Sequence, residues 1–493
     1  MIRTHAIIRQ LQTGVPGLDE VLGGGLQECS FNLIAGRPGC GKTTLAHQIM
    51  FGLATPERPA LYFTAIGEPP LKMLRYQQQY TFFDLDKLNR SVRFVNLAEE
   101  TSAGDLALVL ARIVAEVDQC QPGLVFIDSF TSVLIAGQGE GRSFNGVQQF
   151  VQNLGVLMTS WQATTFLIGA HFSESEHNPV LTVTDGLIWL RQRVQGCAMV
   201  REMEIVKMRG QPSLPGLHAF RISRAGIEVF TPPRPAASAG ASGSASMARL
   251  SIGVAGVDEM MGGGLPGGYV LLVAGPSGSG KSIMAAAFLQ EGARLGQGGV
   301  IAACGRRGCH SHGRRIAELI EGERIGVVDL FTMARSVDEM AQLLVSEIRR
   351  IKATRVVIDS LSDFELALAP ALRDDFREAL ARLLSALAST GATVLMTCER
   401  EDLPGDPGFS RCGPAFLADA LIVQRYVEVG SRLQRAMAVV KVRGSAHSNE
   451  WRCFSIDTDG IVLGEPLADS PWLPGDSRRG GTLLGAEAVE QPS

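Results

Sequence analysis

The sequence predicts an α/β protein with two similar domains, each built on a mostly parallel β-sheet with flanking helices and antiparallel strands at one end. Three observations lead to this prediction. A glycine-rich motif typical of phosphate-binding loops (P-loops) occurs twice. The segments around the two motifs repeat one another. Short apolar runs alternate with helical patterns in both halves, and such alternation builds parallel sheets that are covered on both faces.

The two glycine-rich motifs predict two nucleotide sites. Residues 36–43 (GRPGCGKT) and 275–282 (GPSGSGKS) both fit the pattern G-x-x-x-x-G-K-[ST]. Each motif follows an apolar run that predicts a buried strand, residues 31–35 and 269–274, and leads into a helical pattern. Each loop is therefore expected at a helix N-terminus, where unpaired N–H groups attract phosphate. The residues predicted to bind the nucleotide are Gly36, Gly39, Gly41, Lys42, Thr43 and Thr44 in the first half, and Gly275, Gly278, Gly280, Lys281 and Ser282 in the second.

The repeated segments extend well beyond the two loops. The matching pairs are residues 14–20 and 253–259, 23–26 and 262–265, 124–129 and 355–360, and 207–210 and 441–444. Self-similarity at this long period indicates duplicated domains, because the units of a solenoid are far shorter.

The predicted domains are residues 1–231 and 248–465, since a chain of 493 residues is too long for one ordinary core. Residues 232–247 begin with Pro-Pro-Arg-Pro and continue in alanine, serine and glycine, which is typical of a flexible linker. Residues 466–493 are rich in proline, glycine and charge and are predicted to be a disordered tail.

The composition predicts a globular cytoplasmic protein. No apolar run approaches the roughly 18 residues of a membrane span, and the N-terminus lacks the apolar core of a secretory signal. Nine cysteines without a disulfide-like spacing are typical of a reducing compartment. The net charge of −4 argues against a dominant nucleic-acid role.

The individual elements follow from apolar periodicity. Candidate parallel strands lie at residues 61–63, 92–95, 125–127 and 166–168. Helical spacing relates Leu106, Val109, Ile113 and Val117 in the first half, and Met340, Leu343 or Leu344, Ile348 and Ile351 in the second. Residues 187–190 and 203–206 are closely spaced apolar runs, so each sheet is expected to end in antiparallel hairpins.

ATP and Mg²⁺ are the predicted cofactors, and two aspartates are candidate Mg²⁺ ligands. Asp128 and Asp359 each close an apolar strand and are followed by serine. A carboxylate at that strand end is where a P-loop enzyme holds Mg²⁺, together with the loop hydroxyl, here Thr43 or Ser282. The alternative is that each aspartate only caps the next helix, but the upstream loops favour the metal role.

Glu68 is the candidate catalytic carboxylate of the first domain. It follows the strand at residues 61–64 after a short turn, and that strand end is expected to share a crevice with the P-loop. The alternative is a solvated loop acid beside two prolines. The second domain has Arg307 at the matching position and no carboxylate between Val300 and Arg315. Hydrolysis is therefore predicted mainly in the first domain.

Four metal-capable side chains cluster around Arg307. They are Cys304, Cys309, His310 and His312. A zinc knuckle would need tetrahedral N/S coordination, but the two histidines are very close together and the neighbouring arginines repel a cation. A basic loop is the favoured interpretation.

Two basic pairs, Lys207 with Arg209 and Lys441 with Arg443, lie far along the chain from their own P-loops. Alternate residues of a strand point the same way, so each pair presents two cations on one face. Surface solvation is the usual role of such residues. Their repetition before a glycine in both halves favours phosphate contact, supplied to a neighbouring subunit, with Lys207 and Arg209 in a catalytic role.

Taken together, these motifs resemble those of the KaiC family of RecA-like ATPases, the group containing the cyanobacterial circadian clock protein. The resemblance covers roughly residues 11–230 and 248–463 and rests on the repeated G-V-x-G-[LV]-D-E segments, both P-loops, the I-D-S strand ends and the K-x-R-G segments. It implies two tandem RecA-like domains stacked as two rings of a hexamer. It also implies ATP at subunit interfaces and K-x-R-G cations that act across those interfaces.

The chain departs from the clock protein at two places. The resemblance implies paired catalytic glutamates after the second strand of each domain, whereas Glu68 stands alone and the second domain offers none. It also implies adjacent serine and threonine acceptors before the residue matching Asp419. Ala415 and Phe416 occupy that region, and the nearest hydroxyl is Ser410.

The sequence therefore predicts a ring-forming ATPase that regulates protein partners through its nucleotide state. Three alternatives remain: a serine/threonine autokinase of the clock type, a RecA-like motor on DNA, and an ATP-assembled scaffold without catalysis. The acidic balance places the DNA motor behind the others, and the missing acceptor hydroxyls argue against the autokinase.

Overall fold

The computed structural model describes residues 9–65, 70–88, 90–136, 144–169, 179–195, 198–232, 248–303, 314–330, 336–368, 376–399, 413–429, 432–458 and 460–467. The chain divides into two compact units, Met1–Pro232 and Pro233–Ser493. Almost all of the predicted linker and tail lies outside the described residues, so the predicted domain boundaries stay a prediction. Each unit is described by itself below.

The first unit contains a nine-stranded sheet among its described residues. Its strands are β3 (Phe31–Gly36), β4 (Ala60–Thr64), β5 (Val92–Asn96), β6 (Leu124–Asp128), β7 (Thr164–Gly169), β8 (Gly186–Gln195), β9 (Ala198–Met208), β10 (Leu217–Ser223) and β11 (Gly226–Val229). They are ordered β11-β10-β9-β8-β3-β7-β6-β4-β5. The six strands from β8 to β5 are parallel, and β9, β10 and β11 are added antiparallel.

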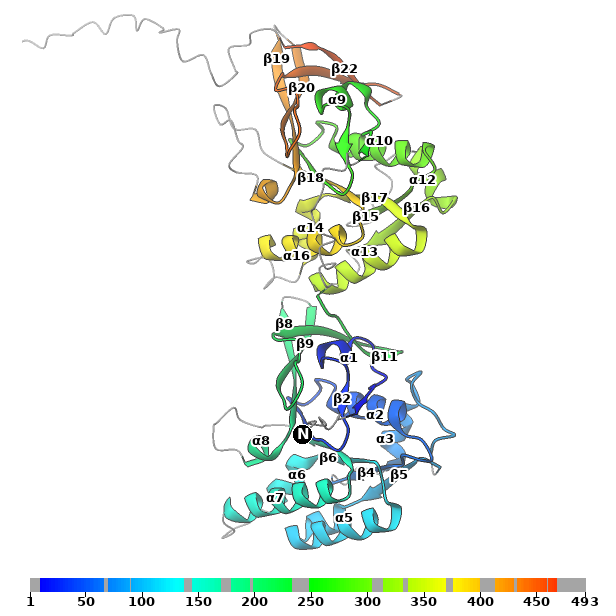
Figure 1. Ribbon diagram of the computed structural model, residues 1–493, viewed down its shortest axis with the longest axis vertical. Coiled ribbons are helices and arrows are strands. Elements are labelled where there is room, and N and C mark those ends of the chain that lie inside the picture. Colours follow the sequence, from blue (N-terminus) through cyan, green and yellow to red (C-terminus); the bar gives the residue numbers. More distant parts are fainter. Residues whose placement is uncertain are drawn as a thin grey trace, which may run out of the picture. The chain divides into compact units, whose positions relative to one another are not determined.

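Helices cover both faces of this sheet (Figure 1). The helices are α1 (Leu18–Val21), α2 (Lys42–Leu53), α3 (Pro70–Gln77), α4 (Ala98–Ser102), α5 (Leu106–Cys120), α6 (Phe130–Ala136), α7 (Phe144–Ser160) and α8 (Pro179–Val183). A small ribbon of β1 (Gln10–Leu11) and β2 (Leu26–Gln27) precedes β3. One core joins α2 to the sheet, and a second core joins α5 and α7 to the opposite face.

The second unit repeats this plan. Its strands are β14 (Val270–Gly275), β15 (Gly298–Ala303), β16 (Ile325–Asp329), β17 (Ala353–Asp359), β18 (Thr393–Glu399), β19 (Ala420–Val429), β20 (Arg432–Val442), β21 (Arg452–Ile456) and β22 (Ile461–Pro466). Within the described part they form a sheet ordered β16-β15-β17-β18-β14-β19-β20-β21-β22. The strands from β16 to β19 are parallel, and the last three are antiparallel.

Helices again flank the sheet in two layers, with α10 (Lys281–Arg294) and α12 (Arg314–Glu321) on one face and α13 (Val337–Ile351) and α16 (Phe376–Ala388) on the other (Figure 1). The other described elements are α9 (Ala255–Met260), α14 (Leu361–Ala367), the 3-10 helix η1 (Gly413–Phe416) and the ribbon β12 (Arg249–Leu250) with β13 (Leu265–Pro266). Local sequence sets α13: the Ser336 hydroxyl accepts from the Glu339 N–H as an N-cap.

The predicted fold class is confirmed: both sheets are mostly parallel, flanked by helices, and end in antiparallel strands. The predicted strands at 61–63, 92–95, 125–127 and 166–168 lie within β4, β5, β6 and β7. The second predicted P-loop strand begins at Val270, one residue later than expected. Within the part of the chain that the structure describes, no helix is long and apolar enough to cross a membrane.

The repeated G-V-x-G-[LV]-D-E segments have a structural role in both units. The Asp19 carboxylate accepts a hydrogen bond from the Thr13 N–H at 2.9 Å. In the same way, Asp258 accepts from the Ile252 N–H at 2.7 Å and from the Ser251 hydroxyl. Each aspartate thus closes the loop that precedes its P-loop strand.

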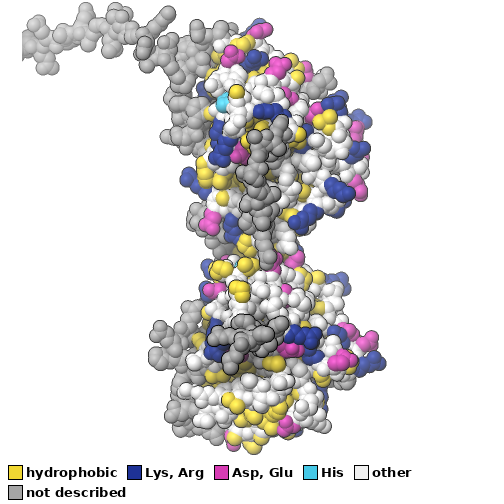
Figure 2. Space-filling view, viewed as in Figure 1, with side chains coloured by type: hydrophobic (Ala, Val, Ile, Leu, Met, Phe, Trp, Pro, Cys, Tyr) yellow, Lys and Arg dark blue, Asp and Glu magenta, His cyan; other side chains and the backbone are white. Residues whose placement is uncertain are grey.

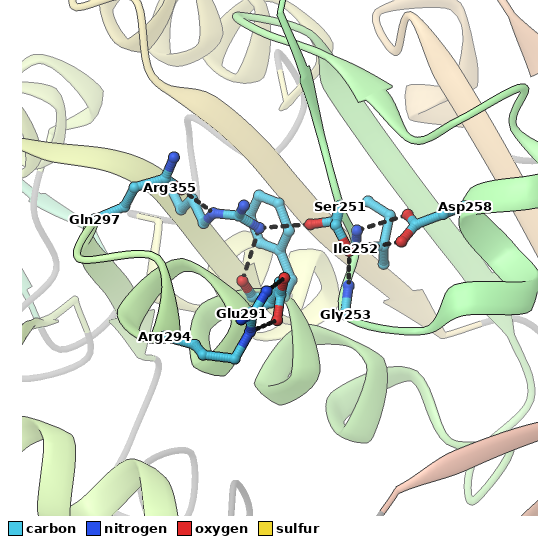
Figure 3. Close-up of polar contacts among 9 residues, drawn as sticks. Ser251, Ile252, Gly253, Asp258, Glu291, Arg294, Gln297 and Arg355 are labelled. Carbon is cyan, nitrogen blue, oxygen red and sulfur yellow. Dashed lines mark hydrogen bonds and ion pairs between the residues drawn. The ribbon is translucent and has the colours of Figure 1, made fainter.

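A buried arginine distinguishes the second unit (Figure 3). Arg355 on β17 is fully buried, whereas the matching residue of the first unit is Leu124. Its guanidinium donates to the Gln297 side chain at 2.8 Å and to the backbone carbonyls of Ser251 and Phe288 at 2.7 and 2.9 Å. It also lies 4.6 Å from the centre of the Phe288 ring. Arg355 therefore joins β17 to α10 and to the loop that Asp258 closes.

We expect Arg355→Leu to lower the free energy of unfolding of the second unit by roughly 2–4 kcal/mol, because buried acceptors lose their donor. Hydrogen exchange in urea, followed separately for peptides of each unit, measures the change. Arg349→Leu, a change at an exposed position of α13, is the matched control and should stay within about 0.5 kcal/mol of the parent. Equal effects of the two substitutions would contradict the assigned role of Arg355.

Candidate functional site

Both P-loops connect the central strand of their sheet to the helix that follows. In the first unit the loop runs from β3 to α2, and in the second from β14 to α10. Gly41 and Gly280 are the N-caps of these helices and have φ of 107° and 110°, a region that favours glycine. A side chain at Gly41 would also meet the Ile222 side chain at 2.7 Å. Each loop therefore presents the free N–H groups of a helix N-terminus.

The predicted lysine and hydroxyl residues of the two nucleotide sites lie in the first turn of these helices. Lys42 is the first residue of α2, and Thr43 and Thr44 follow in the same turn. The Lys42 ammonium donates to the Arg37 carbonyl at 3.0 Å. The Lys281 ammonium donates to the carbonyls of Gly275 and Pro276 at 2.9 and 2.7 Å.

Two carboxylates that lie outside the P-loop motif influence Lys281. Burial lowers the pKa of Lys281, and the negative charges of Glu399 and Asp359 oppose this shift. Ser282, the predicted Mg²⁺ ligand, is the next residue of α10. Two carboxylates therefore act on the second P-loop lysine.

Asp128 contacts the first P-loop directly. It is the last residue of β6, and its Oδ2 accepts hydrogen bonds from the Thr43 hydroxyl at 2.7 Å and from the Tyr62 hydroxyl at 2.8 Å. Burial raises the pKa of Asp128, and the two hydrogen bonds and the charge of Lys42 oppose that rise. The hydroxyl and the carboxylate predicted to hold Mg²⁺ thus already meet, which fits a metal site at this point.

Tyr62 was missed by sequence reasoning. It lies on β4 inside an apolar run, fully buried, and burial together with the Asp128 charge raises its pKa well above the usual value for tyrosine. The only available signal was a hydroxyl within an otherwise apolar strand. Tyr62 fixes the orientation of the Asp128 carboxylate toward α2.

Asp359 is held by a different partner in the second unit. It is the last residue of β17, and its Oδ1 accepts a hydrogen bond from the hydroxyl of Thr397 on β18. Sequence reasoning did not single out Thr397, because the pattern of residues does not reveal that β18 lies next to β17 in the sheet. Both predicted Mg²⁺ carboxylates therefore lie at the same edge of their sheet as the P-loop.

The basic pair of the first unit lies at the sheet edge opposite its own P-loop. Arg209 donates to Asp185 at 3.2 Å, and the same carboxylate accepts from the backbone N–H of Phe31, the first residue of β3. The P-loop begins at the other end of β3, roughly 17 Å away at about 3.3 Å per residue. Lys207 donates to the carbonyls of Leu181 and Thr184 at 3.2 and 2.6 Å.

The second unit repeats this arrangement. Arg443 donates to Asp419 at 3.2 Å, and Asp419 also accepts from the backbone N–H of Val270, the first residue of β14. Lys441 donates to the carbonyl of Ala415 at 3.1 Å. The Arg209 and Arg443 side chains are 57% and 56% exposed, so both guanidinium groups remain accessible at this edge.

Several predicted residues lie outside the described residues: Glu68, Arg307, Cys304, Cys309, His310, His312 and Ser410. The segment leading to Glu68 is described as far as Ala65, whose N–H donates to the Asp128 carbonyl at 2.8 Å. Thr64 pairs with Asp128, and Ala303 pairs with Asp359 in the second unit. In both units the last described residue of this strand and its connection, Ala65 or Ala303, therefore lies beside the candidate Mg²⁺ aspartate.

Comparison with known proteins agrees with this geometry. The family model described as "ATPase: KaiC" matches residues 11–234 and 250–468. The circadian clock oscillator protein KaiC of Rippkaea orientalis is 28% identical over 476 residues, which cover 92% of this chain and 89% of that protein. The proteins of the same name from Picosynechococcus sp. and Synechococcus elongatus are 27% and 26% identical and cover 92% of this chain and 90% and 89% of their own lengths.

Proposed function

Because the chain belongs to the KaiC family of ATPases, we propose that it forms a Mg²⁺–ATP-dependent ring of six subunits that hydrolyses ATP mainly in its first domain. The ring regulates protein partners through its nucleotide state. The observation that carries this proposal is the position of the two basic pairs. Both lie at the sheet edge opposite their own P-loop, where a second copy of the chain can approach.

Each residue of the first site has a defined task in this proposal. The N–H groups of the loop and Lys42 would hold the β- and γ-phosphates, and Thr43 and Asp128 would hold Mg²⁺, which would neutralise phosphate charge when bound. Glu68 orients the attacking water and accepts its proton. Arg209 of a neighbouring subunit stabilises the charge that develops on the transferred phosphoryl group.

Asp185 and Asp419 support the assignment across subunits. Each aspartate accepts a hydrogen bond from its arginine guanidinium at 3.2 Å. The same carboxylate accepts another from the backbone N–H of the first residue of the P-loop strand. A guanidinium held in this way keeps a fixed direction while more than half of its side chain stays exposed. That arrangement suits a group which completes a site on another molecule.

An autokinase of the clock type has less support. The relatives of this chain include circadian clock oscillator proteins. Here Ala415 and Phe416, which have no hydroxyl, form the end of η1 just before Asp419. A DNA motor also has little support. On the face shown in Figure 2, Lys and Arg side chains of the described residues are interspersed with Asp and Glu and form no continuous basic stripe.

Assembly should depend on nucleotide. In Mg²⁺–ATP we expect a particle of about six times the 52.7 kDa mass of one chain, because ATP bound at one subunit recruits the basic pair of the next. Light scattering at micromolar protein measures the mass. The Lys42→Ala, Lys281→Ala double variant is the control and should stay small. A wild-type monomer in millimolar ATP would reject the ring.

A further inference from the structure

The end of β18 places an acid beside the second P-loop. β18 is the direct parallel neighbour of β14, and their register pairs Glu399 with Gly275, the residue at which the P-loop begins. Glu399 is the last residue of β18 and is exposed. Lys281 donates to the carbonyl of this same Gly275 at 2.9 Å. The backbone of Glu399 and the ammonium of Lys281 therefore both lie beside Gly275.

Strand alternation directs Glu399 toward the nucleotide side of the sheet. Leu395 of β18 packs in the core that contains α10, and residues at spacing two share a face. Thr397 and Glu399 therefore face the same side as Leu395. The Thr397 hydroxyl donates to Asp359, the candidate Mg²⁺ carboxylate, so the face of β18 that carries Thr397 lies next to the second nucleotide site.

The two domains differ in the position of the candidate catalytic glutamate. In the first domain Glu68 follows β4, and the residue after Gly169, the end of β7, is Ala170. In the second domain the position matching Glu68 is Arg307, and the position after Cys398 is Glu399. The registers equate Gly169 with Cys398, since they pair with Ala35 and Ala274. The sequence therefore offers Glu68 after β4 in the first domain, whereas the second domain has Glu399 at the end of β18.

We propose that Glu399 is the catalytic carboxylate of the second domain and sustains a slower ATP hydrolysis there. The oxygen of a water molecule bonds to the γ-phosphorus, and the bond from that phosphorus to the β–γ bridging oxygen breaks. The electron pair stays on the β-phosphate of ADP, and the proton of the water passes to Glu399 and then to solvent. This inference rests on the proposed ATPase function and assigns the group that performs it at the second site.

The test uses the full chain with the first site disabled by Lys42→Ala. We expect turnover by this variant to exceed that of the Lys42→Ala, Lys281→Ala baseline. Adding Glu399→Gln should then lower single-turnover hydrolysis about 10²-fold or more, to the baseline, because a positioned base contributes about 10²–10⁴. Bound radiolabelled ATP should be retained. Adding Glu378→Gln, at an exposed position of α16, is the matched control and should leave the rate unchanged.

Three outcomes would overturn the proposal. Lys42→Ala turnover equal to the baseline would mean that the second site does not hydrolyse ATP. An unchanged rate on adding Glu399→Gln would assign the proton transfer to another group. Loss of bound ATP on adding Glu399→Gln would make Glu399 a binding residue. Failure of the ATPase proposal itself is distinguishable, because wild-type protein would then hydrolyse no faster than the baseline.

Discussion

Glu68→Gln should abolish most ATP hydrolysis by the full chain while ATP stays bound at both sites. The amide cannot accept the proton of the attacking water, and loss of a positioned base costs about 10²–10⁴ in rate at that site. The phosphate loop, Lys42 and the contact of Thr43 with Asp128 at 2.7 Å remain, so binding is spared. The rate that remains is that of the second domain.

The measurement is steady-state phosphate release together with the amount of ATP retained per chain. Glu57→Gln, at an exposed position in the turn before β4, is the matched control and should leave both quantities unchanged. Wild-type turnover by Glu68→Gln would remove the catalytic role of Glu68. Loss of bound ATP would instead make it a binding residue.

Arg209→Ala should lower turnover in the first domain by roughly 10³–10⁵, the range of comparable arginine fingers in other nucleotide hydrolases. Arg209 donates to Asp185, which also accepts from the backbone N–H of the first residue of β3. The P-loop of the same subunit follows the other end of that strand. Truncation of a side chain that is 57% exposed should not impair folding. Arg224→Ala, at an exposed turn position, is the control.

Mixing two inactive variants distinguishes action across subunits from action within one subunit. Arg209→Ala chains keep an intact P-loop, and Lys42→Ala chains keep an intact finger. In randomly mixed rings about a quarter of the interfaces should combine the two intact halves and recover activity. No recovery in rings shown to contain both chains would contradict a finger supplied by the neighbour.

Much of this architecture could be predicted from the sequence because its signals are local. The P-loops, the strand-ending Asp128 and Asp359 and the terminal hairpins all follow from motif spacing or apolar alternation within a few residues. The distance of Arg209 from its own P-loop was also predicted from chain position, and its contact with Asp185 agrees with that prediction.

The remaining contacts depend on strand order, which periodicity does not encode. β14 is followed in the chain by β15, yet its neighbours in the sheet are β18 and β19. Glu399 therefore reaches the P-loop although it follows Lys281 by more than a hundred residues in the sequence. The hydroxyl of Tyr62 on Asp128 and the buried Arg355 are likewise long-range contacts. Each of them requires the register of the sheet.

The division of labour between the two sites is the central claim, and single-turnover hydrolysis by full-length Lys281→Ala and Lys42→Ala tests it most directly. Both variants are compared at concentrations where light scattering shows rings. Lys281→Ala, which keeps Glu68 and the first P-loop, should retain most of the wild-type hydrolysis, and Lys42→Ala should retain only the slow fraction that depends on Glu399. Hydrolysis by Lys42→Ala as fast as that by Lys281→Ala would contradict the account.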